Sequence, residues 1–498
     1  NFFDLIIFWS FLSVLACISG RYVGWLFFIL GTAIFLTDAI SLVTTEEHLT
    51  IQALAHFGWD SFVIAFKLTP MLSVAALTLS IVLIVGFIVF YNKLVFFFRT
   101  KNKKFTWCYL ILSLLCIIAH HDVPSAIRKT VTQYYFTQFS TTNLNETISA
   151  LGGQDFIYPE SIKAKQGKNV VIIYLESFED AFFKRKEFKD LVWQTQEIRK
   201  QWNTFSNYQM VDGSTWTISA IYATQTGLPM LVAGMNANNQ LQNLIAPRYP
   251  SIYSILNKAG YVQTFLTGSN KSFAGKGNFL LRNGVDKVID RDTILLENPD
   301  LPLSPWGIYD MDLLNEAKKE YLRLKETGKP FSLSLLTTDL HFPSGHQDSR
   351  LRHTVPIANS LDGLQYSLRI TDHLLHDFLS FLRQHETEDN LAIFVLPDHE
   401  MMGTEAINDN VKILSSGSRG LWFTTNIHNI KGYEQQSKPI YCWDIPQIIL
   451  TAAGIETNVR FGQSLFPQIS PVWIKDHHQE LSRLTFLLNS FKDESQRN

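Results

Sequence analysis

Residues 170–178 read Val-Val-Ile-Ile-Tyr-Leu-Glu-Ser-Phe, an apolar run that ends at a carboxylate. A run that is apolar at every position is typical of a strand buried on both faces of a parallel sheet. Helical patterns separate it from later runs, the clearest one containing Leu364, Leu368, Leu375, Phe378 and Leu382. This alternation predicts an α/β fold, a mostly parallel sheet flanked by helices, with ligands at the carboxyl ends of the strands. The predicted strands are residues 169–175, 262–267, 331–336, 391–396 and 421–425.

Polar side chains follow three of these strands. Glu176 ends the first strand, His341 lies in a turn after residues 331–336, and Asp398 and His399 follow residues 391–396. Carboxylate and imidazole placed together suit a divalent ion such as Zn²⁺ or Mn²⁺. Each signal alone is weak, because Asp-His at a strand end is more often a turn, and an isolated Glu is usually solvated or paired at the surface. Their coincidence favours a metal site.

A hydroxyl-rich stretch precedes one predicted helix. Residues 211–217 read Val-Asp-Gly-Ser-Thr-Trp-Thr, and the apolar segment after them can run as a helix until Gly227 and Pro229. The free N–H groups of a helix N-terminus favour an ionised oxygen and an incoming phosphate. The simpler interpretation of the stretch is an ordinary helix cap.

Composition excludes several classes of protein. The formal net charge of the 498 residues is −2, so no basic field suggests a nucleic-acid partner. Cys17, Cys108 and Cys116 lie in apolar segments, which leaves Cys442 as the one thiol of the polar part. That part can hold neither an internal disulfide nor a cysteine-cluster metal site.

The first 120 residues predict a transmembrane helical domain. Four apolar segments are candidate spans, although the first and last are short of the roughly 20 residues that cross a bilayer. A fifth segment, residues 51–68, carries polar interruptions and is expected to be interfacial or re-entrant. The chain starts at Asn1 without a Met, so a further N-terminal span is left open. The candidate spans are residues 5–19, 22–43, 71–91 and 105–119.

The loop after the third span fixes the expected orientation. It holds Lys93, Arg99, Lys101, Lys103 and Lys104 and is therefore cytoplasmic by the positive-inside rule. The fourth span then delivers the rest of the chain to the outer face of the membrane. We expect a juxtamembrane helix and linker over residues 121–168, a catalytic domain over 169–470 and a C-terminal tail over 471–498.

Four short motifs, taken in their order along the chain, resemble those of a known enzyme family. Leu-Glu-Ser-Phe (175–178), Gly-Ser-Thr-Trp-Thr (213–217), His-Phe-Pro (341–343) and Asp-His (398–399) resemble the membrane-anchored phosphoglycerol transferases. These enzymes belong to the alkaline phosphatase and sulfatase superfamily and include the periplasmic-glucan and lipoteichoic acid synthase types. The resemblance covers about residues 169–465 and includes further matches at residues 223–229, 273–279, 306–310 and 444–450.

The resemblance implies a mechanism. Glu176, Thr215, Asp398 and His399 would bind one divalent ion, Mn²⁺ or Zn²⁺, with Thr215 as the nucleophile. Thr215 would attack the phosphodiester of phosphatidylglycerol, release diacylglycerol, and hold a phosphoglycerol group until a glycan hydroxyl displaces it. His341 resembles the family's substrate-side histidine, which binds phosphate or protonates a departing alkoxide.

Several assignments stay open at this point. Ser214 and Thr217 compete with Thr215 for the role of nucleophile, and the acceptor cannot be read from the chain. The Cys-x-Pro-x-Arg signature of true sulfatases is absent around Thr215. Weaker candidates for head-group or acceptor contacts are Lys276, Arg282, Trp306 and Arg419.

Two other functions compete with phosphoglycerol transfer. A phosphoethanolamine transferase acting on lipid A or another glycan is disfavoured, because Glu400-Met401-Met402-Gly403 follows His399 and Cys442 cannot supply the disulfides of those enzymes. The other is a non-catalytic, membrane-tethered glycan-binding protein. The leading prediction is a multi-pass protein of the bacterial inner membrane with its catalytic domain on the periplasmic or extracellular side.

Overall fold

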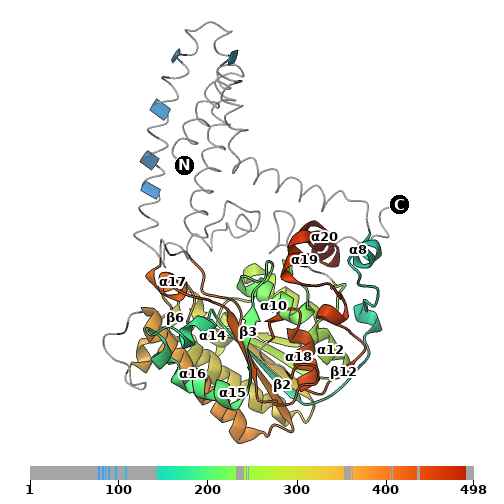
Figure 1. The fold of residues 1–498 in the computed structure, drawn as a ribbon. Coiled ribbons are helices and arrows are strands. Elements are labelled where there is room, and N and C mark those ends of the chain that lie inside the picture. Colours follow the sequence, from blue (N-terminus) through green and yellow to red (C-terminus); the bar gives the residue numbers. More distant parts are fainter. Residues whose placement is uncertain are drawn as a thin grey trace. The chain divides into compact units, whose positions relative to one another are not determined.

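A computed structural model describes residues 143–489 and isolated helical positions between residues 74 and 111. The chain divides into two compact units, Asn1–Tyr135 and Phe136–Asn498, and the fold below is that of the second (Figure 1). Among the described residues, no helix combines the length and the apolar character that crossing a membrane requires. The predicted spans lie almost entirely outside the described residues. The gaps after residue 143 are 232–240, 243, 245, 353–360, 362, 404, 406–407 and 435–437.

An eight-stranded sheet forms the centre of the described part of this unit (Figure 1). Its spatial order is β11-β3-β10-β9-β2-β8-β4-β5, which places β2 between β9 and β8. The carboxyl ends of β9, β2, β8 and β4 therefore lie next to one another at one edge. The strands are β2 (Asn169–Leu175), β3 (Asn203–Gln209), β4 (Val262–Thr267), β5 (Lys287–Ile289), β8 (Phe331–Leu336), β9 (Leu391–Pro397), β10 (Leu421–Thr425) and β11 (Ile440–Tyr441).

The five predicted strands are present, and only β9 differs, by one residue at its end. The sheet is mostly parallel, as predicted, with five parallel pairings among its described strands, but it is mixed because β10 pairs antiparallel with both β9 and β3. The sequence also missed β3, β5 and β11. In β3 buried Phe205 and Tyr208 are interspersed with polar residues, and β5 and β11 have three and two residues, so none of them is a long apolar run.

Side chains of β2 alternate between two hydrophobic cores, one on each face of the sheet. Val170, Ile172 and Tyr174 belong to the core that also contains residues of α10, α12 and α18. Val171 and Ile173 belong to the core that contains residues of α9, α15 and α16. This double burial explains why β2 is apolar throughout. The helices are α9 (Trp193–Gln201), α10 (Thr217–Thr226), α12 (Ile252–Lys258), α15 (Asp310–Glu326), α16 (Gly363–His385) and α18 (Ile445–Ala452).

Shorter elements complete the unit. Two small antiparallel ribbons pair β1 with β12 and β6 with β7. Helices α19 and α20 lie within the predicted tail, and Trp473, Leu481 and Leu488 join the same core as α10. These elements are α8 (Leu144–Ala150), β1 (Ala164–Lys165), α13 (Lys276–Arg282), α14 (Arg291–Glu297), β6 (Leu303–Ser304), β7 (Gly307–Ile308), α17 (Asp409–Leu414), β12 (Glu456–Thr457), α19 (Pro471–Asp476) and α20 (His478–Leu488).

Candidate functional site

The ends of β2 and β9 bring three buried ionisable side chains together. Leu175 pairs with Pro397 in the parallel ladder, so Glu176 and Asp398 leave the sheet side by side. The Nε2 atom of His399 lies 3.5 Å from Oε1 of Glu176 and 3.4 Å from Oδ2 of Asp398. One ligand atom from each of the three residues lies within 4.8 Å of the others. The sequence placed these residues together, and the structure does so too.

Asp398 is held by one of its two carboxylate oxygens. Its Oδ1 atom accepts the backbone N–H groups of Ser177 (2.9 Å) and His399 (2.8 Å). Ser177 has a φ of 53°, a strained conformation for a residue with a side chain, and it also donates its hydroxyl to Oε1 of Glu176 at 2.8 Å. The Oδ2 atom of Asp398 is buried without a hydrogen-bond partner. This role of Ser177 could not be predicted from the sequence.

The imidazole of His399 is oriented from its other nitrogen. Nδ1 lies 2.7 Å from the carbonyl oxygen of Glu400, so Nδ1 carries the proton and donates it. Nε2 is then left with a lone pair directed at the carboxylates. A histidine that binds a metal is typically fixed in this way.

The electrostatics of the three residues are those of a negative site. Burial raises the pKa of Glu176 above its ordinary value, although His399 opposes the shift. Burial and the charge of Glu176 raise the pKa of Asp398 to about 6. Burial lowers the pKa of His399, but the carboxylates of Asp398 and Glu176 more than offset this, and the net shift is upward. Burial thus disfavours the ionised form of both carboxyl groups, and a positive charge placed between them would stabilise that form.

These residues fit a divalent cation. Two carboxylates and one imidazole are a donor set for Mn²⁺ or Zn²⁺, and the unpartnered Oδ2 of Asp398 faces the other two ligand atoms. A buried polar atom without a partner requires an explanation, and a cation between Glu176, Asp398 and His399 supplies one. The superfamily typically uses such an ion. The donor set does not decide which metal it is.

Thr217, one of the three candidate hydroxyls, lies next to this cluster. It is the first residue of α10, and its Oγ1 atom is 3.3 Å from Nε2 of His399. Thr215, the residue implied by the resemblance, is exposed and forms no hydrogen bond with the described part of the chain. Ser214 is buried in a turn, where it donates to the carbonyl of Val211 at 2.8 Å. The geometry therefore favours Thr217.

A second group of side chains approaches the cluster from β8 and the loop before α15. The rings of His341 and Trp306 are tilted against each other with centroids 3.9 Å apart, and Phe273 packs edge-on against Trp306. The Nδ1 atom of His341 lies 3.1 Å from the carbonyl of Phe342. Burial lowers the pKa of His341 to about 4, with the charge of His399 adding to the effect. His341 is therefore neutral at physiological pH.

Lys276 is a buried cation that interacts electrostatically with Glu176 and Asp398. Its Nζ atom donates to Thr267 (3.0 Å), at the end of β4, and to Ser269 (2.7 Å). Burial lowers the pKa of Lys276 to about 8, while the charges of Glu176 and Asp398 oppose that shift. A buried ammonium group in the electrostatic field of both carboxylates is suited to bind the phosphate of a substrate.

Arg419, a predicted substrate contact, supports the turn after His399. Its Nε atom donates to Oε1 of Glu179 at 2.9 Å, and its Nη2 atom donates to the carbonyl of Met401 at 2.8 Å. The N–H of Met401 in turn donates to Glu179 at 2.9 Å. Arg419 therefore fastens the turn after His399 through its Nε and Nη2 atoms. The sequence missed Glu179, which lies only three residues after Glu176.

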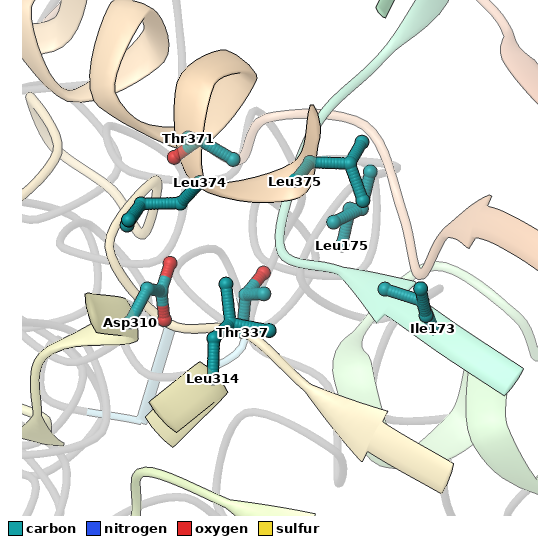
Figure 2. A pocket seen from close by; sticks show the side chains of 8 residues that line it. All are labelled: Ile173, Leu175, Asp310, Leu314, Thr337, Thr371, Leu374 and Leu375. Atoms are coloured by element: carbon teal, nitrogen blue, oxygen red, sulfur yellow. The ribbon is translucent and has the colours of Figure 1, made fainter. Parts of the chain in front are cut away.

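A small cavity lies beside the end of β2, next to Leu175 and Thr337 (Figure 2). Its volume is about 10 Å³, which is enough for about one water molecule and far too small for a lipid head group. Thr337, on its wall, accepts the N–H of Glu176 at 2.9 Å. The cavity is packing space between sheet and helix. It is lined by Ile173, Leu175, Asp310, Leu314, Thr337, Thr371, Leu374 and Leu375.

The fold and the site are those of a known class of proteins. A model of the family "Sulfatase" matches residues 168–458, which is more than half of the chain. The chain belongs to this family. The prediction of an enzyme of the alkaline phosphatase and sulfatase superfamily is confirmed at this level.

Relatives of known name point to one branch of the class. The chain is 30% identical over 241 residues to phosphoglycerol transferase I of Xanthomonas campestris pv. campestris, a match that covers 47% of this chain and 34% of the relative. It is 29% identical over 253 residues to phosphoglycerol transferase I of Escherichia coli, covering 50% of this chain and 32% of the relative. The matched part thus spans about a third of the length of these relatives.

Two solved structures align with part of this chain. The lipoteichoic acid synthase LtaP from Listeria monocytogenes aligns with a TM-score of 0.48 and 15% identity over 68% of this chain and 81% of that chain. The Streptococcus pyogenes phosphoglycerol transferase GacH, solved in complex with sn-glycerol-1-phosphate, aligns with a TM-score of 0.43 and 14% identity over 70% of this chain and 94% of that chain.

Proposed function

We propose that this protein transfers a phosphoglycerol group from phosphatidylglycerol to a hydroxyl of a surface or periplasmic glycan, with Thr217 as the nucleophile. The observation that carries the proposal is the 3.3 Å separation between Oγ1 of Thr217 and Nε2 of His399, at the start of a helix and beside two buried carboxylates. The similarity to curated phosphoglycerol transferases supports the choice of transferred group.

The proposed reaction consists of two successive displacements at phosphorus. In the first, Oγ1 of Thr217 forms a bond to phosphorus, and the bond from phosphorus to the diacylglycerol oxygen breaks. In the second, the acceptor oxygen forms a bond to phosphorus, and the bond to Thr217 breaks. A divalent ion held by Glu176, Asp398 and His399 would lower the pKa of the Thr217 hydroxyl and offset the charge of the phosphate.

His341 is the group that carries the protons. Because Nδ1 donates to the carbonyl of Phe342, Nε2 of the neutral ring is available as a base. In the first step Thr217 loses one proton, and the departing diacylglycerol oxygen gains one proton, so the step is balanced. In the second step Nε2 accepts the proton of the acceptor hydroxyl, and Thr217 recovers a proton as it leaves. Trp306 holds the ring of His341 in place, and Lys276 binds the phosphate.

The membrane prediction belongs to the same proposal. A phosphatidylglycerol donor lies in a bilayer, and the basic loop at residues 93–104 orients the chain so that residues after 120 are outside the cytoplasm. The proposed location is the bacterial inner membrane, with the catalytic unit on its periplasmic or extracellular side.

The proposal is tested with the full chain, supplied with Mn²⁺ and reconstituted in lipid vesicles. Vesicles of phosphatidylglycerol and vesicles of phosphatidylethanolamine are compared, and released diacylglycerol is measured with and without added glycan. We expect release from phosphatidylglycerol that Thr217→Ala abolishes. Release from phosphatidylethanolamine alone would reassign the transferred group, and no release from either lipid would contradict the proposal.

A further inference from the structure

Two buried carboxyl groups lie next to the substrate side of the site. Asp310 is the first residue of α15, and Asp339 follows β8 by three residues. Each is 1% exposed. Within the described part of the chain, neither forms an ion pair with a Lys or Arg. Two buried acids without a cation are costly, so their position calls for a reason.

The two residues hold each other's backbone. Oδ1 of Asp310 accepts the N–H of Thr338 at 2.7 Å, and Oδ2 of Asp310 accepts the N–H of Asp339 at 3.1 Å. In return, Oδ2 of Asp339 accepts the N–H of Asp310 at 3.0 Å. The Oδ1 atom of Asp339 is buried without a partner. Three hydrogen bonds thus join the start of α15 to the turn after β8.

The joined segments carry the two stacked rings of the site. Trp306 lies four residues before Asp310, and His341 lies two residues after Asp339. The N–H of His341 donates to the carbonyl of Thr338 at 3.1 Å, inside the same turn. The hydroxyl of Thr338 donates to the carbonyl of Ile308 at 3.3 Å, inside the other segment. The position of one ring relative to the other therefore depends on the carboxyl pair.

Both carboxyl groups are harder to ionise than an ordinary Asp. Burial raises the pKa of Asp310 to about 7, and it raises the pKa of Asp339 well above its ordinary value, helped by the charge of Asp310. Asp348 and Asp312 add smaller contributions in the same direction for Asp339.

We propose that Asp310 and Asp339 are positioning residues of the active site, which set the Trp306–His341 stack against the phosphate-binding groups. The catalytic part of this inference rests on the proposed function, whereas the structural part does not. Asp310 accepts two N–H groups, one with each oxygen. Asp339 accepts one N–H group. The two residues should therefore differ in how well they tolerate substitution by asparagine.

Asparagine substitutions separate these roles. Asp339→Asn keeps the one acceptor oxygen, so its kcat/KM for phosphatidylglycerol should stay within about threefold of the original. Asp310→Asn turns an NH₂ group toward one of two backbone N–H groups and should lower kcat/KM by about ten- to a hundredfold, the scale of leaving one buried N–H group without an acceptor. Mn²⁺ affinity, measured by titration calorimetry on the full chain, should be unchanged in both variants.

Asp372 provides a matched control. It lies on α16, is fully buried, and also uses both oxygens, accepting the N–H groups of Thr195 at 2.7 Å and Gln194 at 3.2 Å. Unlike Asp310, it also accepts a hydrogen bond from Nη1 of Arg369 at 2.8 Å. Asp372→Asn should therefore lower the melting temperature at least as much as Asp310→Asn. Its kcat/KM should be unchanged. Equal losses of kcat/KM in the two variants would overturn the inference, because the pair would then be merely structural.

A measurement of backbone exchange tests the structural role of the pair without depending on catalytic activity. Hydrogen–deuterium exchange of segments 305–310 and 337–341 should be faster in Asp310→Asn and unchanged in Asp372→Asn. Unchanged exchange in Asp310→Asn would overturn the inference, even if the wild type turns over no lipid. If Asp310→Asn does not fold, Asp339→Leu against Asp339→Asn gives the same comparison, and equal exchange in those two would overturn it.

Discussion

The candidate site has two halves that are built differently. The metal half consists of Glu176, Asp398 and His399, which come from the ends of two neighbouring strands. The substrate half consists of Lys276, Trp306 and His341, which come from a helix start and two loops and are fixed by contacts between distant segments. The ladder of a sheet positions the first half directly. Side-chain hydrogen bonds position the second, so the two halves should respond differently to substitution.

The largest effect should come from the hydroxyl between the halves. Thr217→Ala removes the proposed nucleophile and should lower kcat for diacylglycerol release by on the order of a thousandfold or more. Thr215→Ala, the matched control two residues away, should stay within about threefold because its side chain is exposed. If Thr215→Ala were the inactive variant, the assignment from geometry would be wrong.

The metal half should show the next largest effect. Asp398→Asn keeps Oδ1 as an acceptor for two N–H groups and replaces the unpartnered Oδ2, so Mn²⁺ affinity should fall by on the order of a hundredfold. Without metal the variant should melt no lower than the wild type, because an uncompensated buried charge has been removed. Differential scanning fluorimetry with and without Mn²⁺ measures both. A large stability loss in the metal-free variant would argue against a cation site.

The substrate half should show a pH dependence set by Lys276. Its pKa is lowered to about 8, so the ammonium form that binds phosphate is lost as the pH rises through that value. We expect kcat/KM to fall by up to about tenfold per pH unit above pH 8. Lys276→Arg should move this limb to higher pH, while substitution of exposed Lys271 by Gln should leave it in place. An identical limb in Lys276→Arg would exclude Lys276 as its source.

The smallest effect should come from the support behind the metal half. Arg419→Gln releases Glu179 and the carbonyl of Met401, which loosens the turn after His399. Mn²⁺ affinity should fall by about tenfold, the lower end of what such supporting contacts contribute. The KM for lipid should not change.

Arg185→Gln is the control for that experiment. Arg185 also donates its guanidinium to backbone carbonyls, those of Leu414 and Ser418, but it does not touch the turn after His399. Its Mn²⁺ affinity should be that of the wild type. A raised KM with unchanged metal affinity in Arg419→Gln would instead support the original prediction that Arg419 contacts the substrate.

The same contrast explains what the sequence could and could not predict. Strands buried on both faces are apolar at every position, so β2 and its apolar neighbours were located with bounds close to those observed. Because parallel strands end at one edge, Glu176, Asp398 and His399 could be placed together. The mixed strands β3, β5 and β11 lack that signature, and the antiparallel direction of β10 has none in the sequence.

The substrate half was harder to predict because it depends on tertiary contacts. Nothing local shows that Arg419 is committed to Glu179, or that Asp310 and Asp339 meet. The choice among Ser214, Thr215 and Thr217 depends on where α10 begins. The helix starts at Thr217, and this places the third hydroxyl, not the second, beside His399.

The most direct test of the account is to locate the covalent intermediate. The full chain with Mn²⁺ is incubated with phosphatidylglycerol labelled in its head-group glycerol, quenched in acid before acceptor is added, and digested. Fragment ions that separate Thr215 from Thr217 then show which residue carries the label. The account predicts a phosphoglycerol group on Thr217 that is absent from Thr217→Ala. A label on Thr215 or Ser214, or diacylglycerol release without any label on this peptide, would contradict it.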